Sequence, residues 1–126
     1  MHQHSIHIEE ADIDFMGHVN NAVYLRWVQD AVVDYWRKVA PAEAVAAKLW
    51  VALKHEITYR APAFLDDEVL AQVVATGVEG SRAFFTTLIQ RGDTILAEVK
   101  SSWCCIDTAT RRPARIARDL AKRFLG

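Results

Sequence analysis

The longest periodic pattern in the chain predicts a helix from about Asn21 to Val39. At 100° per residue, its apolar side chains fall on one arc that spans about half the circumference of the helix. The residues on this arc are Tyr24, Leu25, Trp27, Val28, Ala31, Val32, Tyr35, Trp36 and Val39. Asn20 is a candidate N-cap because its side-chain oxygen can accept a helix N–H, and Pro41 marks the end. An arc this wide predicts a helix that the rest of the fold wraps.

Alternation of apolar and polar residues predicts that most of the remaining chain forms strands. Gly80-Ser81 and Gly92-Asp93 are typical of tight turns, so the strands on either side of each should pair antiparallel. The expected strands cover residues 5–10, 49–60, 68–78, 82–91 and 94–106. In the second of them, alternation places on one face Val51, Leu53, His55, Ile57 and Tyr59.

These elements predict one α+β domain over residues 1–126, in which a curved antiparallel sheet wraps one long helix. Short helical segments at residues 42–48 and 114–125 complete the domain. Area scaling for a chain of this length gives burial of about two-thirds of the unfolded surface, so the core needs no disulfide or metal. One helix cannot cover the whole sheet, and its edge strands would stay open, which favours a homodimer.

The charges of the chain nearly cancel. The 15 Lys and Arg residues face 16 Asp and Glu residues, so the basic footprint of a nucleic-acid-binding protein is missing. A local basic cluster near the C-terminus is either a solvated helix face or a contact for a phosphorylated ligand. Its members are Arg111, Arg112, Arg115, Arg118, Lys122 and Arg123.

No pattern in the sequence predicts secretion or a membrane span. The N-terminal residues form no apolar h-region, and no apolar run reaches the length that a bilayer requires. Cys104 and Cys105 are neighbours on an expected strand, so their side chains should point to opposite faces and are poorly placed to pair. We therefore expect a reduced, cytoplasmic protein without a membrane partner.

The stretch from Asp14 to Tyr24 combines a carboxylate, a glycine and the start of the expected helix. Backbone N–H groups at a helix start lack intrahelical partners and carry partial positive charge. Gly17 has no Cβ, so backbone or a ligand can approach it closely. A carboxylate facing such donors can attack a carbonyl group while the donors hold the oxyanion. On spacing alone, Asp14 could equally be an ordinary turn residue.

One motif links this stretch to a known family. The chain resembles the hot-dog-fold acyl-CoA thioesterases of the 4-hydroxybenzoyl-CoA thioesterase type in the run Asp14-x-x-Gly17-His18-Val19-Asn20-Asn21-x-x-Tyr24. Weaker similarity continues in order at residues 24–27, 57–63, 80–82 and 112–113. One departure is Asp66-Asp67, where many relatives have Gly-Asp, and it concerns the shape of a turn. The resemblance implies a hot-dog fold that hydrolyses a small acyl-CoA with no metal or redox cofactor.

The resemblance also implies roles for four residues of the motif. Asp14 matches the catalytic carboxylate, which acts either as a nucleophile or as a general base on water. Asn21 matches the position whose backbone N–H polarises the thioester carbonyl, and Gly17 lies between the two in the motif. His18 orients the loop or contacts the acyl group, and it could equally be a packed loop residue.

Candidate substrate-binding residues are spread over the chain and are Asn20, Tyr24, Arg60, Ser81 and Arg82. Ser81 and Arg82 fall in the turn where relatives often contact coenzyme A, and the arginine fork suits a phosphate. The alternative is that Ser81 closes a hairpin and Arg82 lies in solvent. In this family the site lies between subunits. The resemblance therefore implies a homodimer or homotetramer in which groups of one chain complete the site around Asp14 of the other.

Two other functions stay open, an acyl-carrier-protein thioesterase and a non-catalytic acyl-ligand-binding hot-dog module. A hot-dog hydratase is disfavoured because the chain has no Asn-Pro-x-His run, and a second thioesterase class is disfavoured because its His-Gly-Gly-like loop is missing. His2, His4 and His7 do not have the spacing of a metal site. The identity of the acyl group stays open, since the tryptophans suit a core as well as a pocket.

Overall fold

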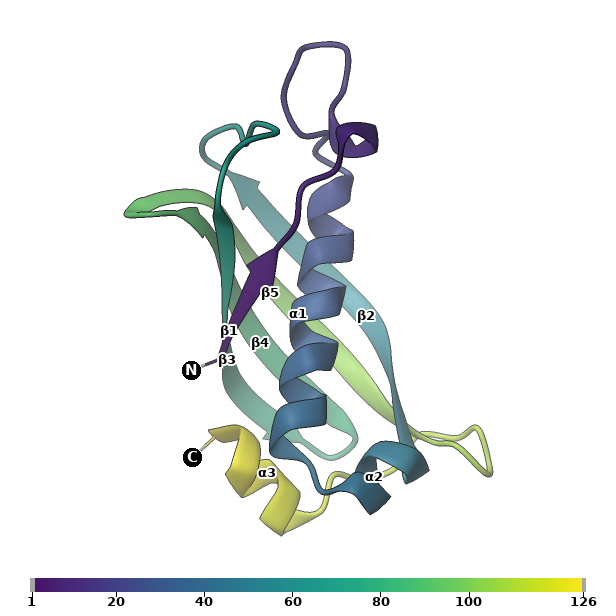
Figure 1. Cartoon of the computed structure of the whole chain (residues 1–126). Helices are drawn as coiled ribbons and strands as arrows, with labels where there is room; N and C mark the ends of the chain where they lie inside the picture. The colour runs from purple at the N-terminus through teal and green to yellow at the C-terminus, as the bar shows by residue number, and fades with distance from the viewer. Residues whose placement is uncertain (1, 126) are drawn as a thin grey trace.

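The computed structural model describes residues 2–125 and shows a five-stranded antiparallel sheet curving around one long helix (Figure 1). Met1 and Gly126 lie outside the described residues. The elements in chain order are β1 (His2–Ile6), the 3-10 turn η1 (Glu10–Asp12), α1 (Val23–Val39), α2 (Ala42–Ala47), β2 (Lys48–Tyr59), β3 (Val69–Glu79), β4 (Arg82–Arg91), β5 (Thr94–Asp107) and α3 (Arg118–Leu125). The predicted α+β architecture is confirmed.

The strands lie in the order β1-β3-β4-β5-β2. β3, β4 and β5 form the two expected hairpins, with Gly80 and Gly92 at positive φ in their turns. β2 pairs with β5 rather than with β3, so that Trp50 lies opposite Cys105. Residues 60–68 therefore carry the chain across the end of the sheet, and β1 and β2 are its two edge strands.

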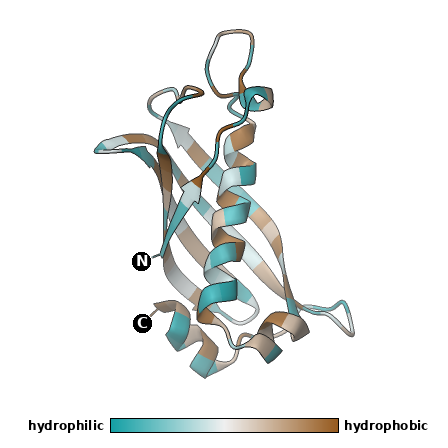
Figure 2. Cartoon of the chain, in the orientation of Figure 1, coloured by the Kyte–Doolittle hydropathy of each residue, from teal (hydrophilic) through white to brown (hydrophobic). Residues whose placement is uncertain are grey.

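α1 buries most of the apolar arc that its periodicity predicts, and polar positions alternate with it along the helix (Figure 2). The expectation is wrong for Leu25, which is 39% exposed. The most deeply buried members of the arc are Tyr24, Trp27, Val28 and Ala31. The predicted helix start is wrong by two residues, because the helix begins at Val23 after the N-cap Ala22, and no side chain caps it. Asn20 lies further upstream, where its Oδ1 accepts a 3.0 Å hydrogen bond from the Ala22 N–H.

β1 lies nearer the N-terminus than the sequence predicts, at residues 2–6 instead of 5–10. Two histidines of this strand, His2 through Nε2 and His4 through Nδ1, lie 2.7 Å and 3.2 Å from Oδ2 of Asp34 on α1. Burial alone would raise the pKa of the Asp34 carboxyl, but these histidines and Lys38 together lower it. The contact fastens the first edge strand to the helix.

A bulge in β2 changes which side chains face the core. The register with β5 shifts between Ala52 and Lys54. Even-numbered residues therefore face the core before the bulge, and odd-numbered residues face it after the bulge. The expected single face is therefore wrong for Val51 and Leu53, which precede the bulge and are 49% exposed. Strict alternation cannot reveal a bulge, because one extra residue inverts the phase beyond it.

The last helix begins at Arg118, four residues later than the sequence predicts. The preceding segment is held extended, since the N–H of Ala114 donates to a carbonyl of β5 and that of Ile116 to the β3–β4 turn. α3 then packs on the C-terminal half of α1, where the Tyr35 hydroxyl donates a 2.6 Å hydrogen bond to the Phe124 carbonyl. Within residues 2–125, no helix has both the length and the apolar character needed to cross a membrane.

Candidate active site

A short hairpin before α1 presents Asp14, at the top of Figure 1. Ile13 and Val19 form an isolated antiparallel bridge, and the Asp14 N–H donates to the His18 carbonyl over 2.9 Å. The Gly17 N–H closes the turn on the Asp14 carbonyl at 3.0 Å. Gly17 has a φ of 85°, which L side chains rarely adopt, so the motif glycine is needed for the backbone of this turn.

The Asp14 carboxylate is anchored through one oxygen and faces an imidazole with the other. Oδ1 accepts a 2.9 Å hydrogen bond from the Met16 N–H. Oδ2 lies 3.7 Å from Nδ1 of His18, which is beyond hydrogen-bond distance. The Asp14 side chain is 19% exposed, so the carboxylate is oriented by the turn and remains reachable. The structure thus brings together Asp14, Gly17 and His18, as the motif predicts.

The Asn21 N–H at the start of α1 has no hydrogen-bond partner within residues 2–125. The Asn20 carbonyl accepts a 2.9 Å hydrogen bond from the Val23 N–H, so it points into the helix. Because the peptide bond between Asn20 and Asn21 is trans, the Asn21 N–H points the opposite way, out of the helix start. It is a backbone donor available to an oxyanion.

A buried carboxylate beneath the hairpin escaped the sequence analysis. Asp12 accepts a 2.9 Å hydrogen bond from Arg26 Nη2 on Oδ1 and a 3.0 Å bond from the Glu9 N–H on Oδ2. Its carbonyl accepts the Asn20 N–H at 2.8 Å. Burial alone would raise the pKa of the Asp12 carboxyl. The hydrogen bond from the Glu9 backbone N–H and the Arg26 guanidinium together bring this pKa below its ordinary value. Asp12 therefore joins η1, the hairpin and α1.

Two tyrosines support the first turn of α1 from the sheet side. Tyr24 is 1% exposed and contacts Tyr59 edge to face, with ring centroids 5.2 Å apart. Burial raises the pKa of both phenols. The Tyr59 hydroxyl donates a 2.8 Å hydrogen bond to the Asn21 carbonyl. Tyr24 thus lies in the core, and no local pattern at the end of β2 could have pointed to the role of Tyr59.

Comparison with known proteins places the chain in a family. Residues 8–124 match the family model described as the Thioesterase-like superfamily. The chain belongs to this superfamily. The acyl-CoA thioester hydrolase YbgC of Escherichia coli strain CFT073 is 28% identical over 120 residues, which are 90% of this chain and 87% of that protein.

Solved structures agree with this family membership. A thioesterase from Thermus thermophilus, complexed with coenzyme A and Zn, superposes with a TM-score of 0.84 at 24% identity, covering 97% of this chain and 90% of that one. A 1,4-dihydroxy-2-naphthoyl-CoA thioesterase from Synechocystis has a TM-score of 0.80 at 17% identity, covering 97% and 93%. The hot-dog fold is thereby confirmed, and the names of the relatives support a thioester hydrolase.

In this thioesterase-like chain, the other candidate substrate-binding residues lie at two different ends. Arg60 follows β2 directly and lies at the end that carries Asp14. Ser81 and Arg82 lie in the β3–β4 turn, close to the C-terminal end of α1. α1 has 17 residues and is therefore about 25 Å long. Within one chain, the turn of Ser81 and Arg82 and the Asp14 hairpin are thus separated by about the length of α1.

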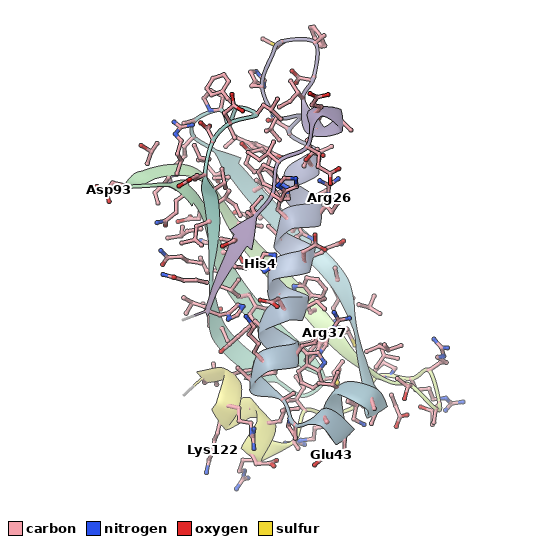
Figure 3. All side chains as sticks on the ribbon, in the orientation of Figure 1. His4, Arg26, Arg37, Glu43, Asp93 and Lys122 are labelled. Atoms are coloured by element: carbon pink, nitrogen blue, oxygen red, sulfur yellow. The ribbon has the colours of Figure 1, made fainter. Side chains whose placement is uncertain are left out.

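Exposed cations gather at the end of the domain that carries α3, where Figure 3 labels Lys122 on α3 and Glu43 on the neighbouring α2. We call the following exposed cations the basic end: Arg82, Arg111, Arg112, Arg115, Arg118, Lys122 and Arg123. None of them forms an ion pair with a carboxylate of residues 2–125. The segments around the Asp14 hairpin carry residues of both signs, among them Glu9, Glu10 and Arg26. The basic end is the part of the chain suited to phosphate groups.

The histidines and cysteines of the chain could in principle serve as metal ligands. Among the described residues, no group of three or more His, Cys, Asp or Glu side chains is arranged to hold a metal ion. His2 and His4 are engaged with Asp34 in the contact that fastens β1. Cys104 and Cys105 are both free thiols and both buried.

Proposed function

We propose that this chain is an acyl-CoA thioesterase that hydrolyses a small acyl-CoA to a carboxylic acid and coenzyme A. The proposal rests on two features of one segment: an oriented, reachable Asp14 carboxylate, and an Asn21 N–H at the start of α1 that has no partner within residues 2–125. Family membership and the acyl-CoA thioester hydrolase from Escherichia coli support the same reaction. In it, Asp14 drives attack on the thioester carbonyl carbon while the Asn21 N–H stabilises the developing oxyanion.

Two routes satisfy this geometry. In the first, an Asp14 oxygen bonds to the acyl carbon, the C–S bond breaks, and water then hydrolyses the mixed anhydride. In the second, Asp14 takes a proton from water as the water oxygen attacks, and the C–S bond breaks afterwards. In both, the coenzyme A thiolate leaves and gains one proton, and neither route uses a metal or redox cofactor. Acid quenching during turnover, followed by intact mass measurement, separates them, since only the first yields an acylated chain.

We propose that a second copy of the chain contributes to the binding of coenzyme A. Arg82 and the basic end suit the phosphates of coenzyme A, but they lie about the length of α1 away from Asp14. An antiparallel copy would place its basic end beside Asp14 of the first. The edge strand β2 supports such an association, because it is 12 residues long and exposes Leu49, Val51 and Leu53. We therefore propose a homodimer, or a homotetramer built from it.

The test is hydrolysis of a panel of short, long and aromatic acyl-CoAs by the wild-type chain and by Asp14→Asn. We expect the substitution to lower kcat at least 100-fold, because it removes the attacking charge and keeps the oxygen that accepts the Met16 N–H. Circular dichroism and elution volume should stay unchanged. Asp93→Asn, on an exposed position of the β4–β5 turn, is the matched control. Near-normal turnover by Asp14→Asn would remove Asp14 from the reaction.

The basic end also favours a second candidate, an acyl-carrier-protein thioesterase, since carrier proteins that are acidic would dock on unpaired arginines. Parallel assays with one acyl group on coenzyme A and on a carrier protein decide between them. A wild-type chain that binds acyl-CoA but hydrolyses neither form would instead be a non-catalytic acyl-ligand-binding module.

A further inference from the structure

We infer that Tyr59 is a positioning residue that sets the direction of the Asn21 N–H through the Asn21 carbonyl. The inference rests on the proposed function, because it concerns the donor that holds the oxyanion. Tyr59 is the last residue of β2, and the contact joins residues that lie 38 positions apart in the chain. It therefore ties the edge of the sheet to the first turn of α1.

The hydrogen bonds around Asn21 show what this contact controls. The Asn21 carbonyl accepts two donors, the Tyr59 hydroxyl at 2.8 Å and the Tyr24 N–H at 3.3 Å. The second is long for a backbone hydrogen bond, so the phenol provides the closer contact. On the other side of Asn21, the Val23 N–H holds the Asn20 carbonyl at 2.9 Å. The two peptide groups that flank the Asn21 Cα are thus both fixed, and they set the direction of its N–H.

The Tyr59 side chain is itself held in place. Its ring stands edge-on to that of Tyr24, at an interplanar angle of 86°. The next residue, Arg60, donates its N–H to the Leu96 carbonyl at 2.8 Å, which secures the end of the strand. Burial raises the pKa of the Tyr59 phenol above its ordinary value, so the hydroxyl keeps its proton at neutral pH and remains a donor.

This arrangement predicts an effect on the chemical step rather than on binding. A donor stabilises an oxyanion in proportion to how well it points at the oxygen of the transition state. Without the phenol, the Asn21 carbonyl keeps only the 3.3 Å bond, and the first turn can relax. Substrate binding through coenzyme A would not change, so the loss should fall on kcat while KM stays constant.

The experiment compares Tyr59→Phe with Tyr35→Phe, two variants that delete the same atom and the same kind of contact. The Tyr35 hydroxyl donates to the Phe124 carbonyl at 2.6 Å, near the far end of α1 from Asp14. We expect Tyr59→Phe to lower kcat about five- to tenfold, with KM within about twofold and the melting temperature nearly unchanged. Tyr35→Phe should lower the melting temperature, because its hydroxyl is buried, and leave kcat unchanged.

Three results would overturn the inference. They are a wild-type kcat in Tyr59→Phe, a rise in KM that accounts for the whole loss, or an equal loss of kcat in Tyr35→Phe. The failure of the proposed function looks different. If the wild-type chain hydrolyses no acyl-CoA, both proposals fail. If it does, and Asp14→Asn is inactive while Tyr59→Phe is normal, only the role of Tyr59 is wrong.

Discussion

Arg26 reaches from α1 to place its Nη2 atom 2.9 Å from Oδ1 of Asp12, whose side chain is only 3% exposed. We expect Asp12→Asn to lower the free energy of unfolding by about 2 kcal/mol, since it removes a charged acceptor that serves Arg26 and the Glu9 N–H. The difference between the two proteins should depend on pH. The native pKa of Asp12 lies below its ordinary 3.8, so its contribution is present above that pH and disappears as the pH falls through the native pKa.

Urea unfolding of both proteins between pH 7 and pH 3 measures this difference. Asp93→Asn, exposed in the β4–β5 turn, is the control and should match the wild type throughout. A stability gap between wild type and Asp12→Asn that stays constant down to pH 3 would contradict the assigned cause.

Arg82 offers a prediction about binding of the nucleotide portion of the substrate. Arg82→Ala should raise KM for acyl-CoA about tenfold and leave kcat within about twofold, because a contact to a phosphate that takes no part in the reaction stabilises ground and transition states equally. The effect should shrink at high ionic strength. Arg60→Ala and Lys100→Ala are the comparisons: the first tests the candidate at the Asp14 end, and the second removes an exposed charge outside both ends. An unchanged KM in Arg82→Ala would remove Arg82 from the site.

Much of the fold could be predicted because it depends on residues close together in sequence. The arc that α1 buries repeats every turn, and the expected bounds of β4, residues 82–91, are those that it has. The pairing of β2 with β5 brings together residues about 50 positions apart, and no local pattern encodes such a partner. The bulge near Ala52 and the extended segment before α3 likewise depend on contacts with distant strands.

The candidate site likewise contains residues that the sequence could place and residues that it could not. Asp14, Gly17 and His18 could be placed together because the hairpin that contains them is a continuous segment closed by its own hydrogen bonds. The role of Asp12 could not be predicted, because it depends on a hydrogen bond from Arg26, which lies further along the chain in the first turn of α1. Tyr59 reaches Asn21 only after the sheet has formed. The residues proposed to react are thus close together in sequence, and the residues that hold them come from elsewhere in the fold.

The edge of β2 yields a prediction about assembly. Val51 is 49% exposed on this strand, so Val51→Lys should weaken the proposed association and shift the chain to a smaller species in sedimentation velocity. Activity should fall with the loss of the larger species, since the proposed site combines Asp14 of one chain with Arg82 of another. Leu125→Lys changes an exposed leucine at the other side of the domain and should leave both unchanged. Full activity from a monomer would contradict a site shared between two copies.

Gly17 allows backbone strain at the hairpin to be separated from general destabilisation. Its φ is 85°, and a Cβ there would meet no heavy atom within 4 Å, so Gly17→Ala strains the backbone without a steric clash. Gly92 in the β4–β5 turn has a φ of 58° and equally open surroundings. Both substitutions should cost about 1 kcal/mol of folding free energy, because alanine in this region of φ is disfavoured to a similar extent. Only Gly17→Ala should also lower kcat, since relief of its strain turns the Asp14 carboxylate away from its Met16 anchor. Equal loss of kcat in the two variants would assign the effect to stability, and the hairpin of Asp14 would then have no special part in turnover.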